Sequence, residues 1–427
     1  MDRKTLAQRD REVTWHPYTQ MQTAPLPIPI VRAEGTLLYD EEGNTYVDAI
    51  SSWWVNTFGH SHPHIVQRVT KQLQELDHVL FAGFTHRPAV ELAEKLLAIL
   101  PPNHKRVFFS DNGSTAVEVA LKMALQYWDN LGLPKTKIVA FRDSYHGDTF
   151  GAMSVSSRSA FTRPFSSLLF DVSFIDVPVP GQEQAALDQL EEICRTGEVA
   201  AFIFEPLVLG TAGMVMYAPA VLENLLTRCR QHDVLTIADE VMTGFGRTGK
   251  NFACDHLSTP PDLMCFSKGL TGGTMALGLT TSTDQLYRAF LSGDKTKTFY
   301  HGHSYTANPL ACSAAVASVE LLQAEKYQVR VREITIRNQA FVERVASLPG
   351  IKAARSCGTI AAVEFEAGQT SYFNSLRDRL YAYALERGVL LRPLGNIVYL
   401  LPPYSVTDEE LEKIYAVILG MREMVNE

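Results

Sequence analysis

The chain has 427 residues, of which 46% are apolar and 20% charged, and a formal net charge of −8. This length exceeds the usual limit of one hydrophobic core, so we expect two structural lobes in an ordinary globular protein. The acidic balance disfavours binding to nucleic acid or to an anionic membrane surface, and no uncharged stretch is long enough to span a bilayer.

The cysteines are scattered along the chain without any Cys-x-x-Cys pair. This pattern predicts reduced, mostly buried thiols in a cytoplasmic protein rather than disulfides or a zinc site. His60, His62 and His64 alternate and could approach one another, but Pro63 interrupts any regular element there. No carboxylate or cysteine accompanies them at ligand spacing, so we predict no metal site.

The order of the expected elements divides the chain into three parts. Residues 1–65 contain short strand signals separated by Gly turns, which favour a small meander. Residues 66–320 alternate apolar strand runs with helical patterns, which predicts an α/β domain with a mainly parallel sheet flanked by helices. Residues 321–427 show an α+β pattern, and we expect them to share a smaller lobe with the first part.

A first candidate site lies at the start of an expected helix. Asn112, Gly113 and Ser114 follow the strand run Val107-Phe-Phe and precede a helical pattern that begins near Val117. A tight turn, hydroxyl groups and free N–H groups at a helix start favour a single phosphate, although an ordinary helix cap would look the same. Gly302 and Ser304 form a second candidate donor segment before an apolar helix, with the same alternative.

Tyr145 follows the expected strand Lys137-Ile-Val-Ala-Phe and precedes Gly147. An aromatic ring at a strand end can lie flat on a cofactor ring, and the glycine permits a close approach of the backbone. Simple packing would explain a lone tyrosine equally well.

The most informative pair is an acid and an amine at the ends of two neighbouring strand runs. Asp239 ends Val234-Leu-Thr-Ile-Ala, and Lys268 follows Leu263-Met-Cys-Phe-Ser. The carboxyl ends of buried parallel strands commonly carry ligand sites. Pyridoxal phosphate needs a lysine for covalent attachment and an acid that keeps its ring nitrogen protonated. Two ordinary charges at strand ends would give the same local pattern.

Together these motifs resemble the class III aminotransferases, which are fold type I enzymes dependent on pyridoxal phosphate. The matching segments keep the family's order across nearly the whole chain, and the long stretch from Asp239 to Lys268 is the most specific of them. They are Gly59–Pro63, Asp111–Ser114, Ser144–Gly147, Glu205-Pro206, Asp239–Gly249, Ser267–Gly269 and Asn308–Ala311.

The resemblance implies a role for each matching residue. Lys268 would hold the cofactor covalently and carry protons, and Asp239 would pair with the ring nitrogen. Asn112, Gly113 and Ser114 would hold the phosphate of one subunit, Ser304 with Gly302 would reach the partner's site in a homodimer, and Tyr145 would stack on the ring. Arg392 would bind a carboxylate, and Tyr18 would also act in catalysis. The implied substrate pocket consists of Tyr18, Trp53, Trp54, Tyr145, Arg247, Lys268, Gly302 and Arg392.

Further stretches resemble one subgroup of this family, which aminates 8-amino-7-oxononanoate in biotin synthesis. They include the segment Trp15–Met21, the pair Trp53-Trp54 and Arg392 near Tyr399–Tyr404. The implied amino donor is S-adenosylmethionine, with lysine as an alternative that the sequence leaves open. Another ω-amine transaminase, an aminomutase or a non-catalytic cofactor-binding protein are the remaining alternatives.

Two positions depart from the family pattern. Leu209 stands before Gly210 where many relatives have a glutamine, which puts a hydrogen bond to the cofactor ring in doubt. His303 precedes Ser304 where a proline is commoner, so we expect a less rigid loop that still offers a hydroxyl group.

Overall fold

The computed structural model describes residues 4–367, 372 and 374–425. A central seven-stranded sheet has the order β4-β12-β11-β10-β7-β5-β6. Its neighbours from β11 through β10, β7 and β5 to β6 run parallel, which confirms the predicted mainly parallel sheet. The strands are β4 (His104–Ser110), β5 (Lys137–Phe141), β6 (Ser173–Ile175), β7 (Val199–Phe204), β10 (Leu235–Asp239), β11 (Leu263–Phe266) and β12 (Gly278–Thr283).

Strand β12 runs antiparallel to both of its neighbours, β11 and β4. No crossover helix separates β11 from β12, since the chain turns through the short 3₁₀ helix Lys268–Thr271 and returns directly. Parallel pairing needs a long crossover, so this short return forces the opposite direction. The turn is also the point at which Lys268 leaves the sheet.

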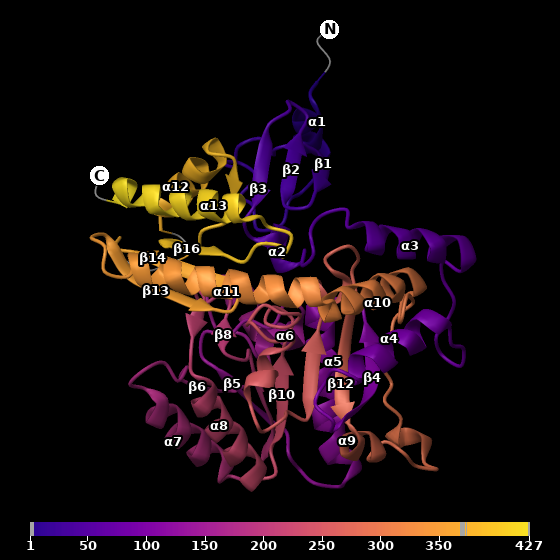
Figure 1. Ribbon diagram of the computed structural model, residues 1–427. Helices are drawn as coiled ribbons and strands as arrows, with labels where there is room; N and C mark the ends of the chain where they lie inside the picture. The colour runs from indigo at the N-terminus through magenta and orange to yellow at the C-terminus, as the bar shows by residue number, and fades with distance from the viewer. Residues whose placement is uncertain (1–3, 368–371, 373, 426–427) are drawn as a thin grey trace.

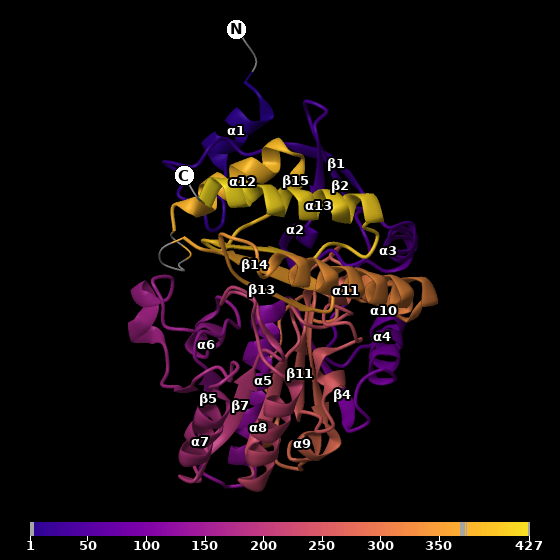
Figure 2. The same ribbon diagram turned by 60° about the vertical axis from the view of Figure 1, so that its left-hand side comes forward.

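Alternate residues of the buried strands face two separate layers of helices. In β7, Ala201 and Ile203 pack with α5, whereas Phe202 and Phe204 point to the opposite face. Helix α5 (Gly113–Asn130) covers the first face, and α7 (Glu183–Cys194) and α8 (Pro219–Gln231) cover the second (Figure 2). Every residue of β7 is buried, as expected for a strand covered on both sides.

Segments from both ends of the chain build the smaller lobe, as predicted (Figure 1). Strand β15 pairs in parallel with β3, so residues near 389 extend the sheet formed by residues 30–48. A three-stranded antiparallel sheet, β13-β14-β16, completes the lobe. These strands are β1 (Ile30–Glu34), β2 (Leu37–Asp40), β3 (Thr45–Asp48), β13 (Ile351–Cys357), β14 (Ile360–Phe365), β15 (Val389–Leu390) and β16 (Ile397–Leu400). The boundaries at residues 65 and 320 remain predictions.

The remaining helices surround these sheets, and α11 crosses between the smaller lobe and the central sheet in both views (Figures 1 and 2). They are α1 (Leu6–Val13), α2 (Ser51–Trp54), α3 (Pro63–Glu75), α4 (Arg87–Leu97), α6 (Phe150–Ser154), α9 (Asp284–Arg288), α10 (Pro309–Gln323), α11 (Glu325–Val345), α12 (Leu376–Glu386) and α13 (Asp408–Gly420). A short hairpin joins β8 (Val208–Leu209) to β9 (Val215–Met216).

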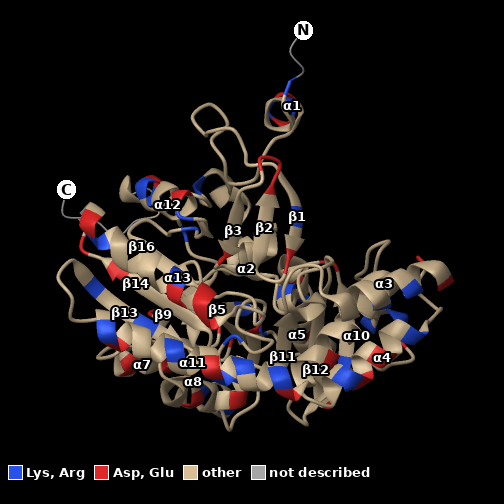
Figure 3. Ribbon diagram, turned by 45° about the horizontal axis from the view of Figure 1, so that its top comes forward, with Lys and Arg blue, Asp and Glu red and all other residues tan. Residues whose placement is uncertain are grey.

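Charged residues of both signs alternate along the outer helices, whereas the central strands are largely free of them (Figure 3). In the described part of the chain, no helix combines the length and apolarity needed to cross a membrane. The three neighbouring histidines bind separate partners: His60 pairs with Asp48, His62 with Tyr327 and His64 with Glu320. They therefore do not converge on a common point.

Candidate active site

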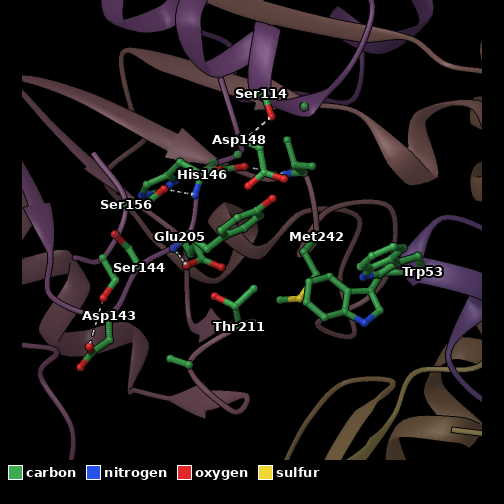
Figure 4. Close-up of a pocket in the computed structure, with 18 of the residues that line it drawn as sticks. Trp53, Ser114, Asp143, Ser144, His146, Asp148, Ser156, Glu205, Thr211 and Met242 are labelled. Atoms are coloured by element: carbon green, nitrogen blue, oxygen red, sulfur yellow. Dashed lines mark hydrogen bonds and ion pairs between the residues drawn. The ribbon is translucent and has the colours of Figure 1, made fainter. Parts of the chain in front are cut away.

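The carboxyl ends of four adjacent strands carry the polar groups of one large cavity. Asp239 ends β10, Lys268 follows β11, Glu205 follows β7, and Tyr145 with His146 follows β5. Because β11, β10, β7 and β5 are neighbours in the sheet, these side chains reach the same volume, a cavity of ≈ 1090 Å³ (Figure 4). The sheet thus brings together residues that are more than a hundred positions apart.

Asp239 is held by its surroundings in one orientation. Its Oδ2 lies 2.7 Å from Nδ1 of His146, and its Oδ1 accepts the N–H of Val241 at 3.1 Å. The carboxylate and the imidazole are 5% and 3% exposed, so both ends of this pair are withdrawn from water. The carboxylate acceptor indicates that the proton resides on Nδ1 of His146. Asp239 is therefore a fixed negative charge at the floor of the cavity.

Lys268 occupies a left-handed backbone conformation, with φ +47°, immediately after β11. Its Nζ lies over the ring of Trp54, 4.6 Å from the centroid. Burial lowers the pKa of Lys268 to about 8, and the negative charges of Asp239 and Glu205 oppose this shift. A lysine with a lowered pKa keeps a substantial fraction of its amine neutral near pH 8, which is the form that attacks a carbonyl carbon.

The phosphate candidates lie at the first turn of α5 and line the same cavity. Asn112 caps the helix, since its side chain accepts the N–H of Thr115 at 3.0 Å. Gly113 and Ser114 occupy the first two helical positions, whose N–H groups have no acceptor within a helix. The segment is therefore compatible with both interpretations of the sequence, a helix cap and a phosphate site. The cap at Asn112 orients Gly113 and Ser114, the two residues that would donate to a phosphate.

The described residues fit pyridoxal phosphate, the cofactor that the resemblance implies. A Cβ at Gly113 would lie 2.8 Å from Cγ1 of Val241, and one at Gly147 would lie 2.0 Å from Oγ of Ser114. Side chains are thus excluded beside the helix start, where a phosphate would need space. The other residues that would contact the cofactor ring and its phosphate line the same cavity. They are Lys268, Asp239, Ser114 and Tyr145.

Aromatic side chains form the other end of the cavity. Tyr18 and Trp53 meet edge to face with their centroids 5.5 Å apart, and the guanidinium of Arg392 lies over Trp53 at 4.3 Å. Burial raises the pKa of Tyr18 to about 12, and its hydroxyl donates to Oδ2 of Asp148 at 2.5 Å. Trp54 is anchored by its indole N–H, which donates to the hydroxyl of Tyr399. At this end of the cavity, Arg392 therefore places a positive charge beside an apolar wall.

Three predicted site residues lie elsewhere. Arg247 was expected to border the substrate pocket, but it is 2% exposed and is not among the residues that line the cavity. Its guanidinium donates to the carbonyl groups of Asn56, Leu401 and Pro402, which makes it a link between segments rather than part of the wall. Gly302 and Ser304 are exposed and do not line this cavity, so their proposed contact with a partner subunit stays a prediction.

Sequence reasoning missed several residues that the structure places in the site. His146 supports Asp239, Asp148 supports Tyr18, and the ring of Phe161 lies 6.4 Å from that of Tyr18. His146 and Asp148 are neighbours of Tyr145, so their position after β5 could have indicated a role. Phe161 comes from an irregular segment and carries no comparable signal in the sequence.

Comparison with known proteins gives concordant results. The class-III aminotransferase family matches residues 18–420. Adenosylmethionine-8-amino-7-oxononanoate aminotransferase from Synechococcus elongatus is 49% identical over 415 residues, which cover 95% of this chain and 97% of the relative. The enzyme of the same name from Geobacter sulfurreducens is 39% identical, with 96% of each chain covered.

Solved structures show the same resemblance in three dimensions. The crystal structure of adenosylmethionine-8-amino-7-oxononanoate aminotransferase from Methanocaldococcus jannaschii has a TM-score of 0.93 and 35% sequence identity, and covers 99% of both chains. An omega transaminase from Pseudomonas jessenii in complex with PMP has a TM-score of 0.91 and 26% identity over 99% of both chains.

Proposed function

The chain belongs to the class III aminotransferase family, and from this premise we propose that it converts 8-amino-7-oxononanoate to 7,8-diaminononanoate in biotin synthesis. S-adenosylmethionine is the proposed amino donor, and pyridoxal phosphate the cofactor. The relatives that carry this activity in their names match nearly the full length of the chain, at higher identity than the omega transaminases.

Pyridoxal phosphate, when bound, supplies a protonated ring that withdraws electrons from the reacting carbon. Asp239 would hold the proton of the ring nitrogen, and His146 keeps the carboxylate in place. Gly113 and Ser114 line the cavity at the start of α5, where they would bind the phosphate. Lys268 would provide the covalent anchor, and its Nζ would remove a proton from the donor carbon in the first half-reaction and return one to the acceptor carbon in the second.

Arg392 is the observation that carries the choice of substrate. It contributes a guanidinium to a cavity that also contains Lys268, and Tyr18 and Trp53 form the adjoining wall. The proposed acceptor has a carboxylate at the far end of an aliphatic chain. A guanidinium can bind that carboxylate with two hydrogen bonds, while the aromatic rings cover the methylene groups. A carboxylate bound at Arg392 would direct the opposite end of the chain, which carries the ketone, into the cavity that also contains Lys268.

We further propose that the active form is a cytoplasmic homodimer with shared sites. Gly302 and Ser304 belong to a family motif, yet the structure places both outside the cavity of their own chain. In a dimer, this exposed segment would reach the phosphate bound by the partner subunit. Sedimentation of the purified protein would test the dimer, and a monomer with full activity would refute the shared site.

The reaction can be followed through the absorbance of the bound cofactor. We expect S-adenosylmethionine to convert the cofactor of the purified enzyme to its amino form, and 8-amino-7-oxononanoate to reverse that change. Lysine in a parallel cell tests the alternative donor, and a response to lysine alone would change the donor but keep the acceptor. No response to either donor, with turnover of simple ω-amines, would instead support a general ω-amine transaminase.

A further inference from the structure

Glu205 is a buried carboxylate in the wall of the cavity that the mechanism above does not use. It is 5% exposed and lines the cavity near His146 (Figure 4). Its two oxygens accept backbone N–H groups, from Tyr145 at 2.9 Å and from Gly210 at 3.0 Å. Within the described part of the chain, no lysine or arginine forms an ion pair with it. A buried acid of this kind needs a cation to remain ionised at low cost.

The other carboxylates that line the cavity already have side-chain partners. Asp111 accepts from Thr115, Asp143 from Ser157, Asp148 from Tyr18, Asp176 from Arg142 and Asp239 from His146. Glu205 differs because only backbone N–H groups donate to it. Burial raises the pKa of Glu205 to about 7, the charge of His146 opposes this shift, and the negative charge of Asp239 adds to it. Among these acids, Glu205 therefore gains most from a positive group that enters the cavity.

Glu205 lines the same cavity as Lys268. Gly210, which donates to Glu205, is so close to Trp54 that a Cβ on it would lie 3.0 Å from Cζ3 of that ring. Nζ of Lys268 lies over the same ring at 4.6 Å, and the charge of Glu205 acts on the pKa of Lys268. Arg392 lies over the neighbouring ring of Trp53. The cavity thus presents a carboxylate, Glu205, and a cation, Arg392, to the same substrate.

The acceptor named under the proposed function has the complementary charges. Its carboxylate is at one end of the chain, and its amino group is on the carbon next to the ketone. A group that binds this ammonium must therefore face the cavity that holds the reacting carbon, and Glu205 lines that cavity together with Lys268. We propose that Glu205 binds the ammonium group of the acceptor and thereby selects an α-amino ketone over a simple ketone.

This inference rests on the proposed function and concerns a specificity-determining residue. An acceptor without the amino group would leave the buried carboxylate of Glu205 unpaired. A site of this kind therefore discriminates strongly against such an acceptor. The wild-type enzyme should therefore prefer 8-amino-7-oxononanoate to 7-oxononanoate, which has hydrogen in place of the amine. We expect a preference of about 10²-fold in kcat/KM.

The test compares both acceptors in wild type, Glu205→Gln and a matched Asp143→Asn variant in the cofactor-loaded enzyme. Glu205→Gln should reduce the preference to within about threefold of unity, chiefly through loss of activity on the aminated acceptor. Asp143→Asn, which neutralises another acid of the same cavity, should leave the preference unchanged. Equal losses on both acceptors in Glu205→Gln would show a structural role and overturn the assignment.

Two further outcomes separate a failure of the proposed function from a failure of the role proposed for Glu205. If wild type fails to aminate 8-amino-7-oxononanoate, the proposed function and the inference fall together. If wild type aminates both acceptors equally well, the proposed function survives and the role of Glu205 is overturned. This second comparison needs no variant, so it remains decisive even if Glu205→Gln fails to fold.

Discussion

The two ends of the cavity are built in different ways. The end with Asp239, His146 and Lys268 lies at the ends of adjacent buried strands, and Asp239 is hydrogen-bonded to His146. The end with Trp53 and Arg392 is assembled from segments near the two termini, through contacts between aromatic rings and a cation. Under the proposed function, the strand ends position the groups that move protons, whereas segments that are far apart in the sequence determine which molecule reaches them.

This difference separates chemistry from specificity. A change at Lys268 or Asp239 should impair every substrate, because both half-reactions of the proposed function use the same amine and the same acid. Glu205, which also follows a strand, is the proposed exception at this end. A change at the aromatic end should affect the substrate whose remote group it binds. The following predictions test that division, beginning with the largest effect.

Replacing Lys268 by Ala should lower kcat/KM for any donor by roughly 10⁴-fold or more, since the proton carrier is lost. Steady-state turnover with each donor measures the effect, and absorbance should show that the cofactor is no longer covalently held. Lys105, which is exposed, provides the control, and Lys105→Ala should retain wild-type turnover. A Lys268→Ala enzyme that keeps a tenth of its activity would contradict the assignment.

Replacing Asp239 by Asn should slow both half-reactions by about 10²–10³-fold, because the ring nitrogen loses its fixed negative partner. The amide oxygen can still accept the hydrogen bond from Nδ1 of His146, so the fold should persist. Stopped-flow absorbance with donor and acceptor in separate experiments measures the two rates. A loss confined to one half-reaction would place Asp239 with the specificity groups instead.

The two arginines that the sequence assigned to one pocket should behave differently. Arg247→Met leaves the carbonyl groups of Asn56, Leu401 and Pro402 without their buried donor, and should destabilise the fold by about 3 kcal/mol. Arg392→Met removes no such network and should cost less than about 1 kcal/mol. Thermal unfolding of both variants measures this contrast, and equal stability losses would remove the distinction.

The pH dependence of cofactor attachment should report the environment of Lys268. Its pKa is lowered from the ordinary value to about 8, so the attacking neutral amine becomes the major form above that pH. Between pH 7 and pH 9 the neutral fraction rises from about one tenth to about nine tenths, and the attachment rate to the apoenzyme should rise roughly tenfold. An increase that begins near pH 10 would indicate an ordinary lysine.

The sequence predicted the strand-end groups well because each lies directly after an apolar run. Asp239, Lys268 and the start of α5 could be placed together once the order of strands and helices indicated a parallel sheet. The partnership of His146 with Asp239 was not predictable, since it joins residues 93 positions apart across the sheet. Leu209 is fully buried, and the hydrogen bond from the neighbouring N–H of Gly210 to Glu205 was likewise not predictable from the sequence.

The aromatic end shows what residue type alone does not reveal. Arg247 and Arg392 both belong to segments that match the family, but the first donates to backbone carbonyl groups of two separate segments and the second lies over Trp53. The direction of an arginine side chain depends on the carbonyl groups and rings around it, and these come from parts of the chain that only folding brings together. Strand β12 is a similar case, since its antiparallel direction results from the short connection to β11 and is not indicated by its residue types.

Rates of the separate half-reactions in Arg392→Ala test the division between the two ends most directly. Single-turnover experiments would follow cofactor absorbance first with S-adenosylmethionine and then with 8-amino-7-oxononanoate. We expect the efficiency of the acceptor half-reaction to fall by about 10²-fold through weaker binding, with the donor half-reaction within about threefold of wild type. Equal loss in both half-reactions would contradict the account, because Arg392 would then serve the chemistry and not the choice of substrate.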